Sequence, residues 1–335
     1  MIEGSLLHVD DVTLVLSTER GEATLLDHVF LNVGHGEMHG LVGESGCGKS
    51  TLVKLVLGLT PLEARIKTGR VMFNEMNLLS LSDLQMNDQV RGKLIGFIPQ
   101  DPFQSFNPLF SVGDQIIQAL KRSPSAKSRT RDELRAHLFA MLERVHIADP
   151  VASLRKLPHQ FSGGQLQRLM IACAFACGPR LVLADEPTSA LDVTTQQQVL
   201  TLIEELNRTS GVAVLLVTHE LGLVTQHCDR VTVMYAGQTA ETMSTDVLLE
   251  DAKHPYTLKL LACHPDRGRG LDGIPGIVPA IVDMPSGCRF HPRCEHAFEQ
   301  CRAGPIPRID VGPKHTLWCR LYQPSNGQEA AFVAS

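Results

Sequence analysis

A glycine-rich segment near the N-terminus has the residue types and spacing of a phosphate-binding loop. Residues 43–50 fit the pattern G-x-x-x-x-G-K-[ST], with a short apolar run before them and a helical pattern after them. Glycines allow a tight turn whose backbone N–H groups point at phosphates, and the positive end of the following helix adds to the attraction. We expect Lys49 to hold the β- and γ-phosphates of a nucleotide and Ser50 to bind Mg²⁺. The predicted nucleotide-binding residues of this loop are Gly43, Glu44, Ser45, Gly46, Cys47, Gly48, Lys49, Ser50 and Thr51.

Two adjacent carboxylates form a second candidate site. Asp185 and Glu186 directly follow an apolar run at residues 181–184. A buried strand that ends in acids places them where an α/β sheet presents its ligand crevice. We expect Asp185 to support Mg²⁺ through water and Glu186 to polarise the water that attacks the γ-phosphate. An acidic strand end that is merely solvated is the alternative interpretation.

These side chains need a sheet that presents them at one edge. A short apolar run at residues 38–42 leads into the glycine-rich loop. The runs at residues 181–184 and 212–217 have the unbroken apolar character of strands covered on both faces, with helical patterns between and around them. Residues 5–33 contain short β-like runs around a turn, and residues 101–160 favour helices. The sequence therefore predicts an α/β fold with a mostly parallel sheet core, an antiparallel β subdomain and an inserted helical subdomain.

A second glycine motif lies shortly before the two carboxylates. Residues 161–165 read Phe-Ser-Gly-Gly-Gln, and Ser162 and Gln165 also fit a capping box at the start of a helix. Together with the phosphate loop, this motif resembles the signature of ABC-type ATPases. In that family, the signature of one domain binds the ATP that a partner's phosphate loop holds. The resemblance assigns this role to Ser162, Gly163, Gly164 and Gln165.

The other motifs of the ABC family follow in the expected order. Gln100 resembles the Q-loop residue, which binds Mg²⁺ and ATP, Asp192 lies in a D-loop-like segment, and His219 resembles the switch histidine. Leu16 stands where the family often stacks an aromatic residue on adenine, so apolar contact remains but π-stacking is lost. The resemblance assigns catalysis to Lys49, Gln100, Glu186 and His219.

The composition of the chain changes after about residue 254, where prolines become frequent. We therefore expect an ABC ATPase domain at 5–253, with its helical subdomain at about 101–165. A cysteine-rich C-terminal extension would occupy 254–325, and residues 326–335 would form a flexible tail. The sequence His-Pro-Tyr-Thr at 254–257 and the extension resemble the ATPase subunits of bacterial dipeptide and oligopeptide importers, a group that includes nickel importers.

The resemblance implies a transport function and several partners. ATP hydrolysis would power import of di- or oligopeptides through two transmembrane permease subunits, supplied indirectly by an extracytoplasmic solute-binding protein. Two nucleotide domains pair head to tail in this family, and importers of this group usually combine two different ATPase chains, so we expect a heterodimer. The protein would be peripheral, on the cytoplasmic face of the inner membrane. The alternatives are a soluble ABC ATPase without a permease and an importer of nickel or another small solute.

Four of the nine cysteines cluster near the C-terminus. Cys288, Cys294, Cys301 and Cys319 form the pattern C-x5-C-x6-C-x17-C. Four thiolates could hold structural zinc or an iron–sulfur cluster, and buried thiols without metal are the alternative. The resemblance to peptide-importer ATPases favours a 4Fe-4S cluster. Cys47, beside Lys49 and a helix N-terminus, is expected to have a lowered thiol pKa.

Composition excludes several other classes of protein. The 335 residues contain 31 Lys and Arg against 36 Asp and Glu, a formal net charge of −5, so there is no global basic excess for nucleic acid. The longest unbroken apolar run, residues 169–177, is nine residues long and too short to span a bilayer. The first thirty residues resemble no secretory signal, which predicts a cytoplasmic chain.

Overall fold

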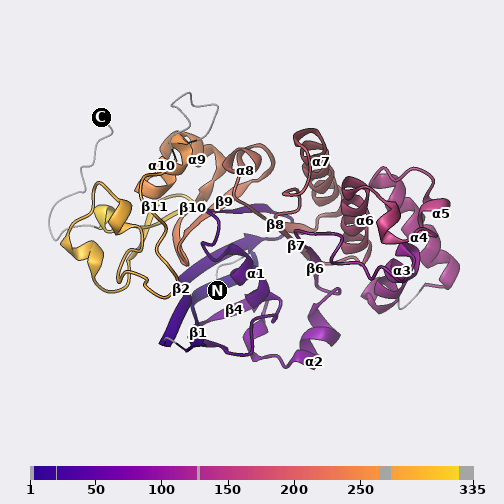
Figure 1. Cartoon of the computed structure of the whole chain (residues 1–335), viewed down its shortest axis with the longest axis horizontal. Helices are drawn as coiled ribbons and strands as arrows, with labels where there is room; N and C mark the ends of the chain where they lie inside the picture. Colours follow the sequence, from indigo (N-terminus) through magenta and orange to yellow (C-terminus); the bar gives the residue numbers. More distant parts are fainter. Residues whose placement is uncertain (1–3, 20, 127–128, 264–272, 324–335) are drawn as a thin grey trace. The chain divides into compact units, whose positions relative to one another are not determined.

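The computed structural model describes residues 4–19, 21–126, 129–263 and 273–323. The tail predicted at 326–335 lies outside these residues. The chain forms two compact units (Figure 1). We call residues 7–32, 39–79 and 218–335 the loop unit, because it contains the phosphate-loop motif, and residues 1–6, 33–38 and 80–217 the signature unit.

The loop unit contains an antiparallel sheet in the strand order β2-β1-β4-β5. Long strands β1 and β4 pair in a register that sets Leu7 opposite Phe73 and Leu16 opposite Ala64. Most of the buried residues of β1 come in two consecutive runs, at 6–7 and 12–15, whereas residues 65–70 of β4 are exposed. The strands are β1 (Ser5–Thr18), β2 (Gly21–Gly34), β4 (Ala64–Phe73) and β5 (Met76–Asn77).

Five further strands of the loop unit follow the order β11-β12-β10-β9-β3. Strand β3 pairs in parallel with β9, whereas β9, β10, β12 and β11 pair antiparallel. A Cβ atom on Gly40 would lie 2.4 Å from a methyl group of Val224, so glycine allows helix α8 to approach β3 closely. The strands are β3 (Met38–Val42), β9 (Arg230–Tyr235), β10 (Gln238–Ser244), β11 (Arg308–Gly312) and β12 (His315–Trp318), and the helices are α1 (Lys49–Val56), α8 (Leu221–His227), α9 (Thr245–Asp251) and α10 (Pro255–Ala262).

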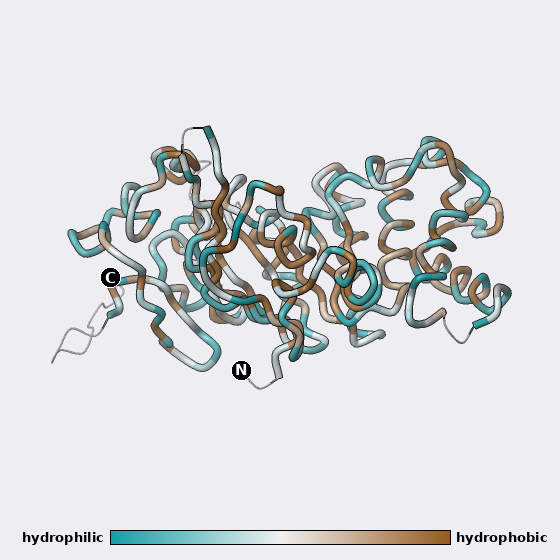
Figure 2. Tube along the Cα trace, turned by 90° about the horizontal axis from the view of Figure 1, so that it is seen from below, coloured by the Kyte–Doolittle hydropathy of each residue, from teal (hydrophilic) through white to brown (hydrophobic). Residues whose placement is uncertain are grey.

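The signature unit combines a parallel sheet, in the order β8-β7-β6, with a group of helices. Every residue of β7 and β8 is buried, which explains their unbroken apolar sequences. Figure 2 shows hydrophobic and hydrophilic residues alternating along the helices of this unit, as expected for helices with one packed face. The elements are β6 (Ile95–Ile98), β7 (Leu181–Asp185), β8 (Ala213–Thr218), α2 (Asp83–Gln85), α3 (Val112–Arg122), α4 (Arg131–Arg144), α5 (Pro150–Ser153), α6 (Gly163–Ala176) and α7 (Val193–Ser210).

The predicted α/β fold class is confirmed, with parallel strands, an antiparallel β subdomain and an inserted group of helices. Within the described residues, no helix is both long and apolar enough to cross a membrane. Single-turn helices complete the structure at Leu78–Ser80, Met86–Val90, Pro124–Ala126, Pro158–Gln160, His291–Arg293, Glu299–Arg302 and Arg320–Tyr322.

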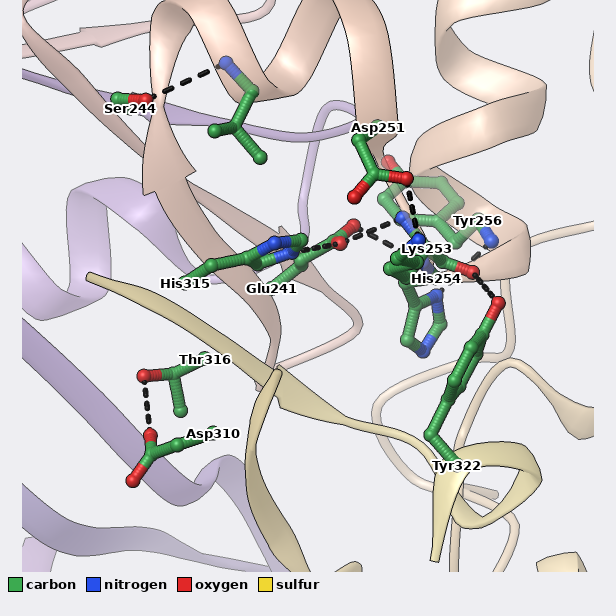
Figure 3. A network of polar contacts seen from close by, with 11 residues as sticks. Glu241, Ser244, Asp251, Lys253, His254, Tyr256, Asp310, His315, Thr316 and Tyr322 are labelled. Carbon is green, nitrogen blue, oxygen red and sulfur yellow. Dashed lines mark hydrogen bonds and ion pairs between the residues drawn. The ribbon is translucent and has the colours of Figure 1, made fainter. Parts of the chain in front are cut away.

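A buried carboxylate connects strand β10 to the C-terminal hairpin and to the start of helix α10 (Figure 3). The side chain of Glu241 is 0 % exposed, and His315 on β12 donates a hydrogen bond from Nε2 to Glu241 Oε1 at 2.8 Å. The backbone N–H groups of Lys253 and His254 also donate to this carboxylate, at 2.7 and 3.1 Å. These contacts fix the start of α10, which carries Tyr256.

His254 is neutral in the folded protein. Its ring is buried, and Nδ1 accepts a hydrogen bond from the N–H of Tyr256 at 3.0 Å, which requires an unprotonated Nδ1. Burial lowers the pKa of His254 from 6.5 to about 4. Between these values the unfolded chain binds a proton at this ring and the folded chain does not, so stability is lost as the pH falls through that window.

We expect acidification from pH 7 to pH 4 to cost about 3 kcal/mol of folding stability through His254 alone. The His254→Asn variant keeps a helix-capping acceptor without a titrating ring, so its stability should depend less on pH. Urea unfolding at several pH values between 4 and 7.5 would measure the difference. His159→Asn, at an exposed position, is the control and should retain the wild-type pH dependence. An unchanged pH dependence in His254→Asn would contradict the assignment.

Candidate nucleotide site

The phosphate-loop motif connects strand β3 to helix α1. Gly43 has φ +156°, and a Cβ atom there would lie 2.1 Å from the carbonyl oxygen of Met234. Gly48, with φ +101°, is the left-handed residue directly before α1. The N–H of Gly237, in the turn between β9 and β10, donates to the carbonyl oxygen of Cys47 at 2.8 Å. Glycine is therefore required on both sides of the loop, and the neighbouring turn supports it.

Lys49 is buried and lies against the beginning of its own loop. Its Nζ donates hydrogen bonds to the carbonyl oxygens of Gly43, at 2.7 Å, and Glu44, at 3.1 Å. Ser50 is exposed and Thr51 is half-buried at the start of α1. The loop therefore combines an ammonium group with a helix N-terminus that carries hydroxyl side chains. This combination is suited to binding a nucleoside triphosphate and its Mg²⁺.

The expected lowering of the Cys47 pKa is wrong. The side chain is 1 % exposed, and burial raises the pKa of the thiol more strongly than Lys49 lowers it. Nearness in sequence to a lysine and a helix N-terminus does not show whether a side chain points into the protein. Cys47 is a neutral, buried thiol.

Parallel strand pairing brings Gln100 to Glu186 in the signature unit. Ile98 on β6 lies opposite Ala184 on β7, so residues that follow the two strands emerge side by side. Gln100 Nε2 donates to Glu186 Oε2 at 3.3 Å. Asp185 is the buried last residue of β7, and Glu186, with φ +46°, donates its N–H to the carbonyl oxygen of Val217 at 2.9 Å. The sheet thus places an amide and two carboxyl groups at one edge.

The signature motif begins helix α6, and its capping box is present. The N–H of Gln165 donates to Ser162 Oγ at 3.3 Å, and the N–H of Ser162 donates to Gln165 Oε1 at 3.1 Å. Gly163 and Gly164 form the first turn of the helix. A pocket of about 370 Å³ lies over this turn, and its lining residues include Ser162, Gly163, Gly164, Gln165, Leu191, Asp192 and Thr195.

The three remaining candidate residues, Asp192, His219 and Leu16, lie at or near the ends of helices and strands. Asp192 caps helix α7, where it accepts hydrogen bonds from the N–H and Oγ1 of Thr195, and these bonds lower the pKa of the carboxyl group. His219 follows strand β8 and is exposed. Leu16 is half-buried on β1. Asp192 directly precedes α7, His219 directly follows β8, and Leu16 lies near the end of β1.

Two family models match this chain. The model described as "ABC transporter" matches residues 26–189, and the model described as "Oligopeptide/dipeptide transporter, C-terminal region" matches residues 240–301. A probable peptide ABC transporter ATP-binding protein of Sinorhizobium fredii is 43 % identical and is matched over 94 % of both chains. The chain is an ABC transporter ATP-binding protein.

Other similar proteins agree with this membership. The dipeptide transport ATP-binding protein DppD of Escherichia coli is 39 % identical, over 89 % of this chain and 91 % of the relative. The oligopeptide transport ATP-binding protein OppD of Salmonella typhimurium is 39 % identical, over 90 % and 89 %. A dimeric post-hydrolysis state of the ATP-binding cassette MJ0796, bound to ADP and Pi, matches with a TM-score of 0.63 and 26 % identity, over 71 % of this chain and 98 % of that one. This ABC ATPase is therefore an ATP-hydrolysing subunit that uses ATP and Mg²⁺.

The predicted 4Fe-4S cluster in this ABC ATPase is wrong. In the part of the chain that the structure describes, which includes all four candidate cysteines, no group of three or more His, Cys, Asp or Glu side chains could hold a metal ion. The same finding removes the zinc alternative. Burial raises the pKa of Cys288 to about 11 and that of Cys319 to about 12, and it also raises that of Cys294, so these three side chains are protonated thiols at neutral pH in the metal-free chain.

The C-terminal region has other means of stabilisation. The ring of Trp318 stacks on Phe30 with centroids 5.3 Å apart, and Phe290 packs edge-on against Tyr235 at 5.1 Å. Arg289 is buried and donates to the carbonyl oxygen of Ala236 in the turn that supports the phosphate loop. Aromatic packing and a buried arginine therefore connect the C-terminal region to strands β2 and β9 and to the turn that follows β9.

Sequence reasoning also missed two residues that contact the phosphate loop. The N–H of Glu44 donates to Tyr256 Oη at 2.9 Å, and the Glu44 carboxylate forms an ion pair with Arg293 at 2.7 Å. Glu44 and Arg293 are 249 positions apart in the chain. No local sequence pattern indicates such a pair.

Proposed function

We propose that this chain is a peripheral ATPase subunit on the cytoplasmic face of the inner membrane. Its ATP hydrolysis would power the import of di- or oligopeptides into the cell. The observation that carries the proposal is the presence, in one chain, of the ABC ATPase match and the oligopeptide/dipeptide transporter C-terminal match. Relatives that are similar over most of their length are named for dipeptide and oligopeptide transport. The chain would work with two transmembrane permease subunits.

The proposed hydrolysis uses the groups at the sheet edge. Glu186 would accept the proton of a water molecule whose oxygen attacks the γ-phosphorus, while the bond to the β–γ bridging oxygen breaks. Gln100, whose amide donates to Glu186 in the structure, would orient that carboxylate. Ser50 and Gln100 would bind Mg²⁺, and Asp185 would support it through water. Lys49 would offset the negative charge of the β- and γ-phosphates, and His219 would hydrogen-bond the γ-phosphate.

The proposed partner is a second, different ABC ATPase chain. Ser162, Gly163, Gly164 and Gln165 line an open pocket at a capped helix N-terminus, which suits the γ-phosphate of an ATP held by another chain. This chain contains one phosphate-loop motif and one signature motif. Two such chains arranged head to tail would complete two sites, and an extracytoplasmic solute-binding protein would deliver the peptide to the permease.

Transport by the reconstituted complex tests this proposal. We expect the complex purified from membranes to contain one copy of this chain beside a second ATPase chain, as measured by native mass spectrometry. With its solute-binding protein, it should move labelled dipeptide or oligopeptide across proteoliposomes only when MgATP is supplied. Transport of Ni²⁺ but not peptide would make the protein a metal importer. Purification of this chain from cells with no permease subunit attached would favour a soluble ATPase.

A further inference from the structure

The guanidinium group of Arg293 is fully engaged beside the phosphate loop. Its side chain is 4 % exposed, and all five of its N–H groups have acceptors. Nε donates to the carbonyl oxygen of Pro275 at 2.9 Å, and one NH2 group donates to Glu44 Oε2 at 2.7 Å and to Tyr235 Oη at 3.1 Å. The other donates to Glu44 Oε1 at 3.2 Å and to the carbonyl oxygen of Ile274 at 2.7 Å.

The surroundings hold Arg293 in this orientation. The guanidinium carbon lies 5.6 Å from the centre of the Tyr235 ring, and Gly276 passes so close that a Cβ atom there would be 3.0 Å from the Arg293 side chain. Lys259 of helix α10 donates to the backbone carbonyl oxygen of Arg293 at 3.2 Å. The guanidinium group, with every N–H donor satisfied and its side chain held in place, is a preorganised fork of donors. The single ammonium group of lysine could not make the same set of hydrogen bonds.

Glu44, the partner of Arg293, is the second residue of the phosphate-loop motif. Its backbone is held on both sides, because its N–H donates to Tyr256 Oη and its carbonyl oxygen accepts from Lys49 Nζ. Its carboxylate is only 26 % exposed, so its negative charge is not fully screened by water. A nucleoside triphosphate bound by the same loop is also strongly negative, and an unpaired Glu44 carboxylate would repel it.

We propose that Arg293 is a positioning residue for nucleotide binding, which neutralises Glu44 and fixes the phosphate loop from the C-terminal region. The inference rests on the ATP-binding function of this loop. If Arg293 has this role, the C-terminal region helps to determine the affinity of the same chain for nucleotide. Two effects are combined: the bidentate pair orients the loop backbone at Glu44, and it cancels a charge that opposes the phosphates.

Arg293→Met removes the charge and the fork but keeps an unbranched apolar stem. We expect the Kd of the full-length chain for MgATP to rise about tenfold, which is less than the loss expected for breaking a fully buried charge pair from one side, because the Glu44 side chain is 26 % exposed. The increase should be smaller for MgADP, which carries less charge, and smaller at 0.5 M than at 0.05 M salt. The rate at saturating MgATP should change less than the Kd, because no reacting group is altered.

A double variant separates charge from packing. Glu44→Gln combined with Arg293→Met leaves no unpaired charge, so its Kd for MgATP should return to within about threefold of wild type. Arg308→Met, which removes an exposed arginine of the same region, is the matched control and should bind as wild type does. A purely structural role for Arg293 predicts no recovery in the double variant and no dependence on salt or nucleotide charge.

Several results would overturn the proposal. A folded Arg293→Met chain with wild-type affinity would remove the positioning role, and a double variant as weak as the single one would remove the charge effect. If Arg293→Met does not fold, Arg293→Lys keeps the charge without the fork and should bind MgATP with intermediate affinity; wild-type affinity there would overturn the role of the fork. The measurement needs no permease, so loss of peptide transport and failure of this inference are distinguishable.

Discussion

Glu186→Gln is expected to lower the rate of ATP hydrolysis at least about 100-fold while MgATP still binds. The amide has nearly the shape of the carboxylate but cannot accept the proton of the attacking water. Gln100 Nε2 can still donate to the remaining side-chain oxygen, so the geometry at the end of β7 should survive. Phosphate release at saturating MgATP and equilibrium binding of a fluorescent nucleotide measure the two quantities separately.

The same variant should accumulate the ATP-bound, paired state, because the nucleotide that joins two chains is no longer hydrolysed. Light scattering with MgATP would show the increase in mass, either alone or with the proposed partner chain. Glu143→Gln, at an exposed position on α4, is the control and should hydrolyse ATP at the wild-type rate. Undiminished hydrolysis by Glu186→Gln would assign the general base to another residue.

The parts of this fold that sequence predicts are those fixed by local spacing. The phosphate-loop and signature motifs each lie at the start of a helix, where glycines and a capping serine determine the backbone. The neighbourhood of Gln100 and Glu186 follows from one further rule, because parallel strands that pair in register carry the residues after them to the same edge. The fold class could be predicted for the same reasons.

Burial and long-range pairing could not be predicted in this way. Four cysteines within 32 residues suggested a metal, but the spacing of thiols does not determine whether three of them converge or whether burial keeps them protonated. Cys47 was misread for the same reason, since its direction depends on the packing of the loop. The contact between Glu44 and Arg293 depends on how the C-terminal region returns to the phosphate loop, and neither local sequence carries that information.

Glu241→Ala is expected to lower the free energy of unfolding by about 3–5 kcal/mol at pH 7, because it breaks a buried charge network from one side. The variant leaves the ring of His315 and the N–H groups of Lys253 and His254 without their acceptor in the interior (Figure 3). Equilibrium unfolding in urea, followed by circular dichroism, measures the change. Asp310→Ala is the control, because Asp310 lies on the same hairpin but is 69 % exposed, and it should cost less than about 1 kcal/mol.

The pH dependence of that loss identifies its cause. Burial alone raises the pKa of Glu241, but hydrogen bonds, first among them that of His315, lower it below its ordinary value of 4.5. A carboxyl group with a lowered pKa stabilises the fold above about pH 4.5, and that stability disappears as the pH falls through its pKa in the folded protein. The difference in the free energy of unfolding between wild type and Glu241→Ala should therefore be constant near neutrality and become smaller in acid.

Because Glu241 fixes the start of α10, which carries Tyr256, the variant should also weaken MgATP binding. A destabilised variant that still binds MgATP as wild type does would separate the C-terminal hairpin from the phosphate loop.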